Sequence, residues 1–426
     1  AICHGEKTMD KLLITGGRRL FGSVPVSSAK NAVLPLFAAS VLTEEPVTIR
    51  GVPAISDALC MAQILRELGA EVTFSGGDVT IDSASSCSHE IPPSLTRELR
   101  SSVFMLGSLL TRFRRALIAY PGGCDIGLRP IDMHLSALRR LGVGIDEHDG
   151  YIFCKCEKLK GAEISLDFPS VGATENVLLA AVMAEGETVL RGAAREPEIV
   201  DLARFLRAMG AKISGAGTDV IAIEGVKKLR GVSYAPMKDR IEAGTYLIMA
   251  AVCGGEVETQ GAAPENLGLL LHKLRENGCK IGAKNDKIRL ESSGKLKCNR
   301  RIETMPFPGF PTDLQAQAAA LNSGAEGCAL IEENLFETRF KYVPELRKMG
   351  ADIEVKGRTA LIRGVPRLHG ASLVAGDLRG AAALVVAALG AEGESEVLDL
   401  SHLDRGYEDL PHKLKKLGAK IARVRV

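Results

Sequence analysis

The sequence predicts an α/β protein built from six copies of one β-α-β-α-β-β unit, and three observations support this prediction. A motif of basic helix end, glycine and strand recurs six times, with its glycines at positions 69, 142, 210, 278, 350 and 418. The spacings between these glycines, 73, 68, 68, 72 and 68 residues, are nearly constant. Within each repeat, helical and strand-like patterns alternate in the same order, which is typical of sheets packed on helices.

Each element of the unit is expected from local chemistry. A glycine after a helix that ends in Lys or Arg is the usual C-terminal cap, because glycine takes the left-handed conformation without strain. Two short strands joined by a turn follow it, as in residues 70–83 and 211–225. A helix of small residues comes next, as in residues 176–186, and a strand and a second amphipathic helix then lead back to the glycine.

The two ends of the chain complement each other. The sixth unit stops one strand short, and the opening segment 11–22 aligns with second-strand segments such as residues 219–231 and 359–370. We therefore expect the N-terminal strand to complete the last unit. The six units then divide into a domain of residues 30–237 and a domain of residues 1–29 plus 238–426. A single solenoid of six units is the alternative.

Composition excludes several classes of protein. With 46% hydrophobic and 25% charged residues over 426 positions, the chain forms a packed core and is not disordered. Lys plus Arg number 54 against 52 for Asp plus Glu, and tryptophan is absent, so nothing favours a nucleic-acid partner. Apolar runs are far shorter than the roughly 20 residues of a membrane span. The first residues lack the apolar core of a signal peptide.

The ten cysteines do not form a metal-binding pattern. Only Cys154 and Cys156 lie close together, and no histidine or second cysteine pair stands at zinc spacing from them. The better interpretation is reduced thiols in a cytoplasmic protein. We expect no metal.

Charged residues gather where the small-residue helices begin. Five of the six expected helix starts carry Lys, Arg or Asp, namely Lys30, Arg100, Asp239 with Arg240, Asp313, and Asp377 with Arg379. A helix N-terminus attracts anions, so a cation there destabilises the helix slightly and requires a reason. Each cation taken alone is explained by pairing with a nearby aspartate or by snorkelling. Taken together, they favour an anion-binding cleft between two domains.

Two loops carry further candidate residues. Residues 120–134 display Cys124 on a glycine-rich turn, with Arg129 nearby. A lone cysteine is usually a small buried apolar residue, but a cation beside an exposed thiol favours the reactive thiolate. Asp125 acts in the opposite direction. In the second loop, residues 402–411, Arg405 precedes a helix, and the alternative for it is a surface pair with Glu408 or Asp409.

From about Met9 to its end, the chain resembles the UDP-N-acetylglucosamine 1-carboxyvinyltransferases. The motifs that carry the resemblance are SSAKNAVLPL, RSSVFMLG, PGGCDIGLRPIDMH, PSVGATEN, AAREPEIVDLA, FPTDLQAQ, ENLFETRF, VPELRKMGA, GDLRGAAAL and HLDRGYE. The resemblance implies an inside-out α/β barrel of two three-unit domains with the active site between them. It implies transfer of the enolpyruvyl group of phosphoenolpyruvate to the 3′-hydroxyl of UDP-N-acetylglucosamine, with release of phosphate, as the first committed step of peptidoglycan synthesis. No cofactor is implied.

The resemblance also assigns site residues. For phosphoenolpyruvate they are Lys30, Asn31, Arg129 and Arg405. For the nucleotide sugar they are Arg100, Arg129, Pro130, Ile131, Asp132, Met133, Ser170, Val171, Gly172, Asp313 and Leu335. Cys124 is the expected acid and the target of alkylators such as fosfomycin, Asp313 is the expected base or the group that binds the 3′-hydroxyl, and Asp377 and Arg379 complete the site. Phe168 and Asp125 depart from the family pattern.

Three alternatives stay open. The shikimate-pathway enolpyruvyl transferase shares the fold and the donor, but it lacks the PGGC loop that contains Cys124. A non-catalytic paralogue that binds UDP-sugars and regulates the pathway would not need Cys124, Asp313 and Arg405 together. A repeat scaffold for protein partners would scatter its charges over the units.

Overall fold

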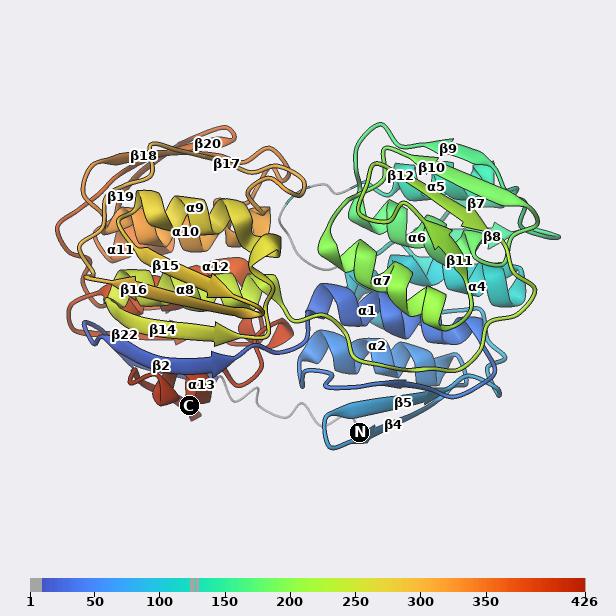
Figure 1. The fold of residues 1–426 in the computed structure, drawn as a ribbon, viewed down its shortest axis with the longest axis horizontal. Helices are drawn as coiled ribbons and strands as arrows, with labels where there is room; N and C mark the ends of the chain where they lie inside the picture. Colours follow the sequence, from blue (N-terminus) through green and yellow to red (C-terminus); the bar gives the residue numbers. More distant parts are fainter. Residues whose placement is uncertain (1–9, 123–126, 128–129, 426) are drawn as a thin grey trace. The chain divides into compact units, whose positions relative to one another are not determined.

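The computed structural model describes residues 10–122, 127 and 130–425 and divides into two compact units (Figure 1). We call residues 10–26 and 238–425 the terminal unit, because it contains both ends of the described chain. Residues 27–122 and 130–237 form the central unit. Each unit has its own apolar core.

The terminal unit contains three four-stranded sheets. In each, one edge strand pairs parallel to its neighbour and the other two pairings are antiparallel. In sheet order the strands are β21 (Ser372–Val374), β22 (Glu394–Leu398), β1 (Asp10–Thr15) and β23 (Lys420–Arg425); β15 (Lys280–Lys284), β16 (Lys287–Ser292), β14 (Gly255–Gln260) and β2 (Leu20–Pro25); and β17 (Arg301–Glu303), β18 (Cys328–Glu332), β20 (Thr359–Arg363) and β19 (Asp352–Lys356).

The central unit repeats this pattern. Its strands are β13 (Ser233–Tyr234), β3 (Val47–Ile49), β5 (Asp78–Asp82) and β4 (Glu71–Ser75); β11 (Lys212–Ser214), β12 (Val220–Glu224), β10 (Glu187–Arg191) and β9 (Glu163–Ser165); and β6 (Arg115–Ala119), β8 (Tyr151–Lys155) and β7 (Gly144–His148). The last sheet has three strands, and an isolated parallel bridge between Glu90 and Leu117 stands where the fourth would pair.

The expected pairing at the chain ends is present. Strand β1 lies between β22 and β23, with Leu12 opposite Val397 on one side and Arg423 on the other. It therefore fills the place that β12 and β20 fill in their own sheets. The prediction of six β-α-β-α-β-β repeats is confirmed by these six sheets, three in the terminal unit and three in the central unit.

Three small-residue helices pack together in each unit. These inner helices are α1 (Lys30–Ala39), α4 (Met105–Phe113), α6 (Val171–Ala181), α8 (Arg240–Cys253), α10 (Gln315–Ser323) and α12 (Leu378–Gly390). Nearly all of their residues are buried, because small side chains on every face let helices approach closely between sheets. In the common α/β barrel the sheet lies inside and the helices lie outside, whereas here the small-residue helices lie inside and the sheets lie outside.

The remaining helices are amphipathic or short. They are α2 (Ser56–Glu67), α3 (Pro93–Glu98), α5 (Asp132–Arg140), α7 (Pro197–Ala208), α9 (Gly268–Glu276), α11 (Val343–Lys348) and α13 (Leu410–Lys416), with 3₁₀ turns η1 (Ser40–Leu42), η2 (Arg100–Phe104), η3 (Pro264–Leu267), η4 (Thr312–Leu314) and η5 (Leu403–Arg405). All six repeat glycines adopt φ between 90° and 109°, as their capping role requires. No helix in the described ranges has the length and apolar character needed to cross a bilayer.

Candidate active site

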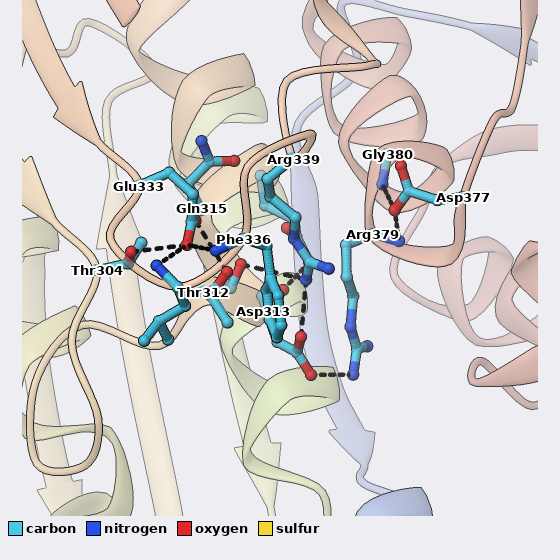
Figure 2. Close-up of polar contacts among 12 residues, drawn as sticks. Thr304, Thr312, Asp313, Gln315, Glu333, Phe336, Arg339, Asp377, Arg379 and Gly380 are labelled. Atoms are coloured by element: carbon cyan, nitrogen blue, oxygen red, sulfur yellow. Dashed lines mark hydrogen bonds and ion pairs between the residues drawn. The ribbon is translucent and has the colours of Figure 1, made fainter. Parts of the chain in front are cut away.

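A carboxylate held between two buried arginines dominates the terminal unit (Figure 2). Asp313 lies in η4, just before α10, and its Oδ1 accepts a hydrogen bond of 2.7 Å from Arg339 Nη2. Its Oδ2 accepts one of 2.8 Å from Arg379 Nη2. The side chains of Arg339 and Arg379 are only 3% and 5% exposed, whereas that of Asp313 is 25% exposed. The carboxylate is thus fixed by two ion pairs, and part of its side chain stays exposed.

The start of α12 explains how Arg379 reaches Asp313. Asp377 is the N-cap, and its Oδ1 accepts hydrogen bonds of 3.0 Å from the backbone N–H groups of Arg379 and Gly380. Burial lowers the pKa of Arg379, but Asp313, Tyr407 and Asp239 together raise it above its usual value. Arg379 therefore remains a cation despite its burial.

A hydroxyl network supports Arg379 from the core. The hydroxyl of Tyr407 lies 2.9 Å from Thr245 Oγ1, and it accepts hydrogen bonds from Gln317 Nε2 at 3.3 Å and Arg379 Nη1 at 3.4 Å. Burial is the main cause that raises the pKa of Tyr407. Because Thr245, Gln317 and Arg379 belong to α8, α10 and α12, this network ties the three inner helices together at one end.

Three other residues of the terminal unit that the sequence singled out are Arg405, Leu335 and Asp239. Arg405 ends η5, two residues before Tyr407. Leu335 lies in the loop after β18, and its backbone N–H donates to Glu333 Oε1 at 2.9 Å. Asp239 caps α8 through the N–H groups of Ile241 and Glu242. Capping, the ordinary explanation for aspartates at helix starts, therefore holds for Asp239 and Asp377.

In the central unit, Lys30 is already paired. Lys30 begins α1, and its Nζ donates to Asp57 Oδ2 of α2 over 2.8 Å. Both side chains are largely buried. An ammonium group has three donors, so this pair leaves Lys30 able to bind an anion as well. Asn31, the next residue of α1, is half-buried.

A second network joins the segments expected to hold the nucleotide sugar. Asn176 Oδ1 accepts from Gly107 N at 2.8 Å, and its Nδ2 donates to Val103 O at 2.9 Å. Asn176 Nδ2 also lies 2.9 Å from His134 Nδ1. Because the two backbone partners fix which end of the amide is NH₂, His134 Nδ1 must accept. The ring then carries a proton on Nε2 alone.

This network lies beside two expected binding segments. His134 follows Pro130, Ile131, Asp132 and Met133. A Cβ on Gly172 would lie 2.8 Å from His134 Cε1, so the helix start packs closely against the imidazole. Ser170, the N-cap of α6, accepts from Ala173 N at 3.3 Å and leaves Val171 and Gly172 in the first turn.

Arg100 was expected at an α-helix start and differs in detail. It begins η2, and α4 begins only at Met105. Its Nη1 donates to Pro121 O at 3.5 Å, which ties it to the beginning of the glycine-rich loop. Cys124, Asp125 and Arg129 lie outside the described residues. Among the residues that are described, no group of three or more His, Cys, Asp or Glu side chains is placed to hold a metal ion.

Sequence reasoning missed Arg339, Tyr407 and Glu333. Arg339 and Glu333 belong to the ENLFETRF motif and Tyr407 to HLDRGYE, yet none stands at a helix start, which was the signal used to choose charged residues. Their partners are far away in the chain, since 26 residues separate Arg339 from Asp313.

Comparisons with known proteins agree with this architecture. The family model described as EPSP synthase (3-phosphoshikimate 1-carboxyvinyltransferase) matches residues 14–414. UDP-N-acetylglucosamine 1-carboxyvinyltransferase 2 of Caldanaerobacter subterraneus subsp. tengcongensis is 50% identical over 98% of this chain and 100% of its own length. UDP-N-acetylglucosamine 1-carboxyvinyltransferase 1 of Carboxydothermus hydrogenoformans is 48% identical over 98% and 99%.

Solved structures show the same fold. The enolpyruvyl transferase NikO from Streptomyces tendae superposes with a TM-score of 0.87 at 27% identity, covering 98% of this chain and all of that one. An EPSP synthase from Acinetobacter baumannii gives a TM-score of 0.74 at 19% identity, with the same coverage. The second likeness is evidence for the fold alone.

Proposed function

The chain belongs to the UDP-N-acetylglucosamine 1-carboxyvinyltransferase family, and from this premise we propose how its residues serve the reaction. The enzyme transfers the enolpyruvyl group of phosphoenolpyruvate to the 3′-hydroxyl of UDP-N-acetylglucosamine and releases phosphate, the first step of peptidoglycan synthesis. The observation that carries the assignment is near-50% identity along almost the whole chain to transferases of this name.

Asp313 is the residue that we assign to the acceptor hydroxyl. A carboxylate oxygen accepts more than one hydrogen bond, and the side chain is partly exposed. The carboxylate therefore accepts the 3′-hydroxyl and takes its proton as the new C–O bond forms at C2 of phosphoenolpyruvate. The two arginines hold it in one orientation, so no reorganisation is needed during the reaction.

Cations and an acid act on phosphoenolpyruvate. We assign Lys30, Arg129 and Arg405 to its phosphate and carboxylate, which carry charge that these cations neutralise. Cys124 delivers a proton to the methylene carbon while the sugar oxygen attacks C2. Loss of phosphate and of one methyl proton then restores the enol ether. Both substrates are multiply charged metabolites, and we propose that the reaction takes place in the cytoplasm.

Arg100 and the neutral network of Asn176 and His134 support the nucleotide sugar in this proposal. The network holds the α6 start, where the backbone N–H groups of Val171 and Gly172 face no intrahelical acceptor. Such N–H groups bind anionic or carbonyl oxygen atoms of a nucleotide.

The test is phosphate release from phosphoenolpyruvate, with and without UDP-N-acetylglucosamine, with the product identified by mass. We expect release only with the sugar nucleotide and a product heavier by one enolpyruvyl group. Shikimate 3-phosphate is the matched acceptor control, and release with it alone would assign the chain to the other branch of the fold. Tight binding of the UDP-sugar without release would identify a regulatory paralogue.

Alkylation tests the assignment of Cys124 separately. Burial raises the pKa of Cys154 to about 12, so that thiol is a poor nucleophile at neutral pH. Cys87 and Cys328 are exposed and serve as internal controls. Fosfomycin followed by peptide mapping should modify Cys124 and leave these three cysteines free, and an adduct on Cys87 or Cys328 instead would contradict the assignment.

A further inference from the structure

Glu333 is a fully buried carboxylate that collects four hydrogen bonds. It follows β18 directly and has no exposed surface. Its Oε1 accepts from Thr304 Oγ1 at 2.9 Å, Leu335 N at 2.9 Å and Phe336 N at 3.1 Å. Its Oε2 accepts from Thr312 Oγ1 at 2.8 Å. All four partners donate, so both oxygens of Glu333 serve as acceptors and neither is left without a hydrogen bond.

These bonds join two segments that the proposed function uses. Thr312 precedes Asp313 in η4, whereas the N–H groups of Leu335 and Phe336 belong to the loop of residues 333–339. Figure 2 shows Glu333 between Thr304, Thr312 and Phe336, on the side of the Thr312 turn away from Arg379. Glu333 is thus bonded at once to the turn that carries the proposed base and to the loop that carries Leu335.

The same loop is fastened to the same turn a second time. At its far end, Arg339 Nη2 binds Asp313 Oδ1 at 2.7 Å and Thr312 O at 3.3 Å. Two attachments, one near each end of the loop, fix both its distance from the turn and its orientation. The Arg339 attachment acts on the carboxylate of Asp313 itself. The Glu333 attachment acts only on the neighbouring residue, Thr312, and has no surface with which to touch a ligand.

We propose that Glu333 is a positioning residue for the transfer reaction, which holds the Thr312–Asp313 turn and the Leu335 loop at one fixed separation. The inference rests on the proposed function, because the separation matters only if Asp313 takes the acceptor proton while the Leu335 backbone holds the sugar nucleotide. We call the bond from Thr312 the Oε2 arm and the bonds from Thr304, Leu335 and Phe336 the Oε1 arm. Loss of the Oε2 arm should then change turnover, and loss of both arms should change turnover and nucleotide binding together.

The test compares three variants. Thr312→Val removes only the Oε2 arm and keeps the side-chain shape, so we expect kcat to fall about tenfold with KM for UDP-N-acetylglucosamine unchanged within about twofold. Glu333→Gln retains an oxygen for the two backbone N–H groups and replaces the charge-assisted bond from Thr312 with a neutral one, from its NH₂ to the hydroxyl oxygen, so we expect a smaller loss of kcat. Glu333→Ala removes both arms, and kcat should fall while KM for the sugar nucleotide rises.

A double variant separates positioning from general stability. If Glu333 acts on Asp313 through Thr312, Thr312→Val combined with Glu333→Gln should lose no more kcat than the worse single variant. A merely structural role would lower the melting temperature and leave kcat per folded enzyme unchanged. The matched control is Glu332→Gln. Glu332 is the residue before Glu333, its own carboxylate pairs with Arg301 at the surface, and the variant should keep kcat within about twofold.

The outcomes distinguish this inference from the proposed function. A wild-type enzyme without sugar-dependent phosphate release overturns both. An active wild type whose folded Thr312→Val and Glu333→Gln variants turn over as fast as the Glu332→Gln control overturns the inference alone. If Glu333→Ala does not fold, Thr312→Val remains decisive, since it removes a single hydroxyl.

Discussion

The two units present different chemistry at the ends of the same kind of helix. In the terminal unit, Asp313 binds two buried arginines, and a hydroxyl network behind Arg379 joins three inner helices. In the central unit the corresponding junction is neutral, with the amide of Asn176 bonded to backbone groups and an imidazole. The charge pairs preorganise the carboxylate that we propose as the base, whereas the neutral network supports the α6 start that we propose to hold the sugar nucleotide.

The two units also differ in how they surround a buried glutamate. Glu333 in the terminal unit accepts four hydrogen bonds. Glu175 in the central unit is 1% exposed, and its Oε2 has no hydrogen-bond partner among the residues that the structure describes. Burial, followed by the nearby Glu198 and Glu196, raises the pKa of Glu175 well above its ordinary value. Both side chains are almost completely buried, so the two sites differ in the supply of hydrogen-bond donors around the carboxyl group.

The largest expected effect is at Asp313. Asp313→Asn removes the proposed base and sets an NH₂ group against one arginine, so kcat should fall by about 10²- to 10⁴-fold. Phosphate release under saturating substrates measures it. Asp352→Asn, which alters an exposed pair with Arg363, is the control and should be close to wild type. An Asp313→Asn enzyme with near-normal kcat would show that Asp313 is not the base.

The neutral junction should matter more for stability than for turnover. Asn176→Ala leaves Gly107 N–H, Val103 C=O and His134 Nδ1 without this partner in a buried site. We expect a loss of about 2–4 kcal/mol in the free energy of unfolding, measured by urea titration. Asn176→Asp should also destabilise, because a carboxylate cannot donate to Val103 O. A loss below about 0.5 kcal/mol for both variants would contradict the proposed junction.

A smaller effect is expected from the hydroxyl behind Arg379. Tyr407→Phe removes the group shared by Thr245, Gln317 and Arg379 and should cost about 1–2 kcal/mol of unfolding free energy. Turnover should fall only a few-fold, since Asp313 still holds Arg379. A fall in kcat as large as that of Asp313→Asn would mean that Tyr407 takes part in the chemistry.

The smallest effect is a pH dependence from Glu175. Its pKa is raised on folding, so its contribution to stability is complete below the unfolded value and declines as pH rises toward the folded value. Glu175→Gln removes this decline, and the stability of the variant relative to wild type should grow between pH 5 and pH 8, by on the order of 1 kcal/mol. The exposed Glu187→Gln is the control. A difference independent of pH would contradict the assignment.

The repeat could be predicted from the sequence, but the hydrogen bonds and ion pairs between side chains far apart in the chain could not. The six glycines and the N-terminal strand follow from short-range capping and from a pattern repeated six times, so both were found. Arg339 and Glu333 were missed because they pair across two loops of one repeat that lie more than 20 residues apart in the chain. Tyr407 was missed because it contacts Thr245 and Gln317, which belong to other repeats. Lys30 was expected to bind phosphoenolpyruvate or, taken alone, to snorkel or pair with a nearby aspartate, and its partner Asp57 lies one helix further along. Nothing local to Lys30 indicates that contact.

The most direct test of the roles proposed for Asp313 and Arg100 is calorimetric titration with UDP-N-acetylglucosamine, paired with kcat, for Asp313→Asn and Arg100→Gln. We expect Asp313→Asn to keep Kd within about threefold while kcat falls at least about 100-fold. We expect Arg100→Gln to weaken Kd about tenfold while kcat at saturation stays within about threefold. Equal proportional losses of binding and turnover in both variants would contradict these roles.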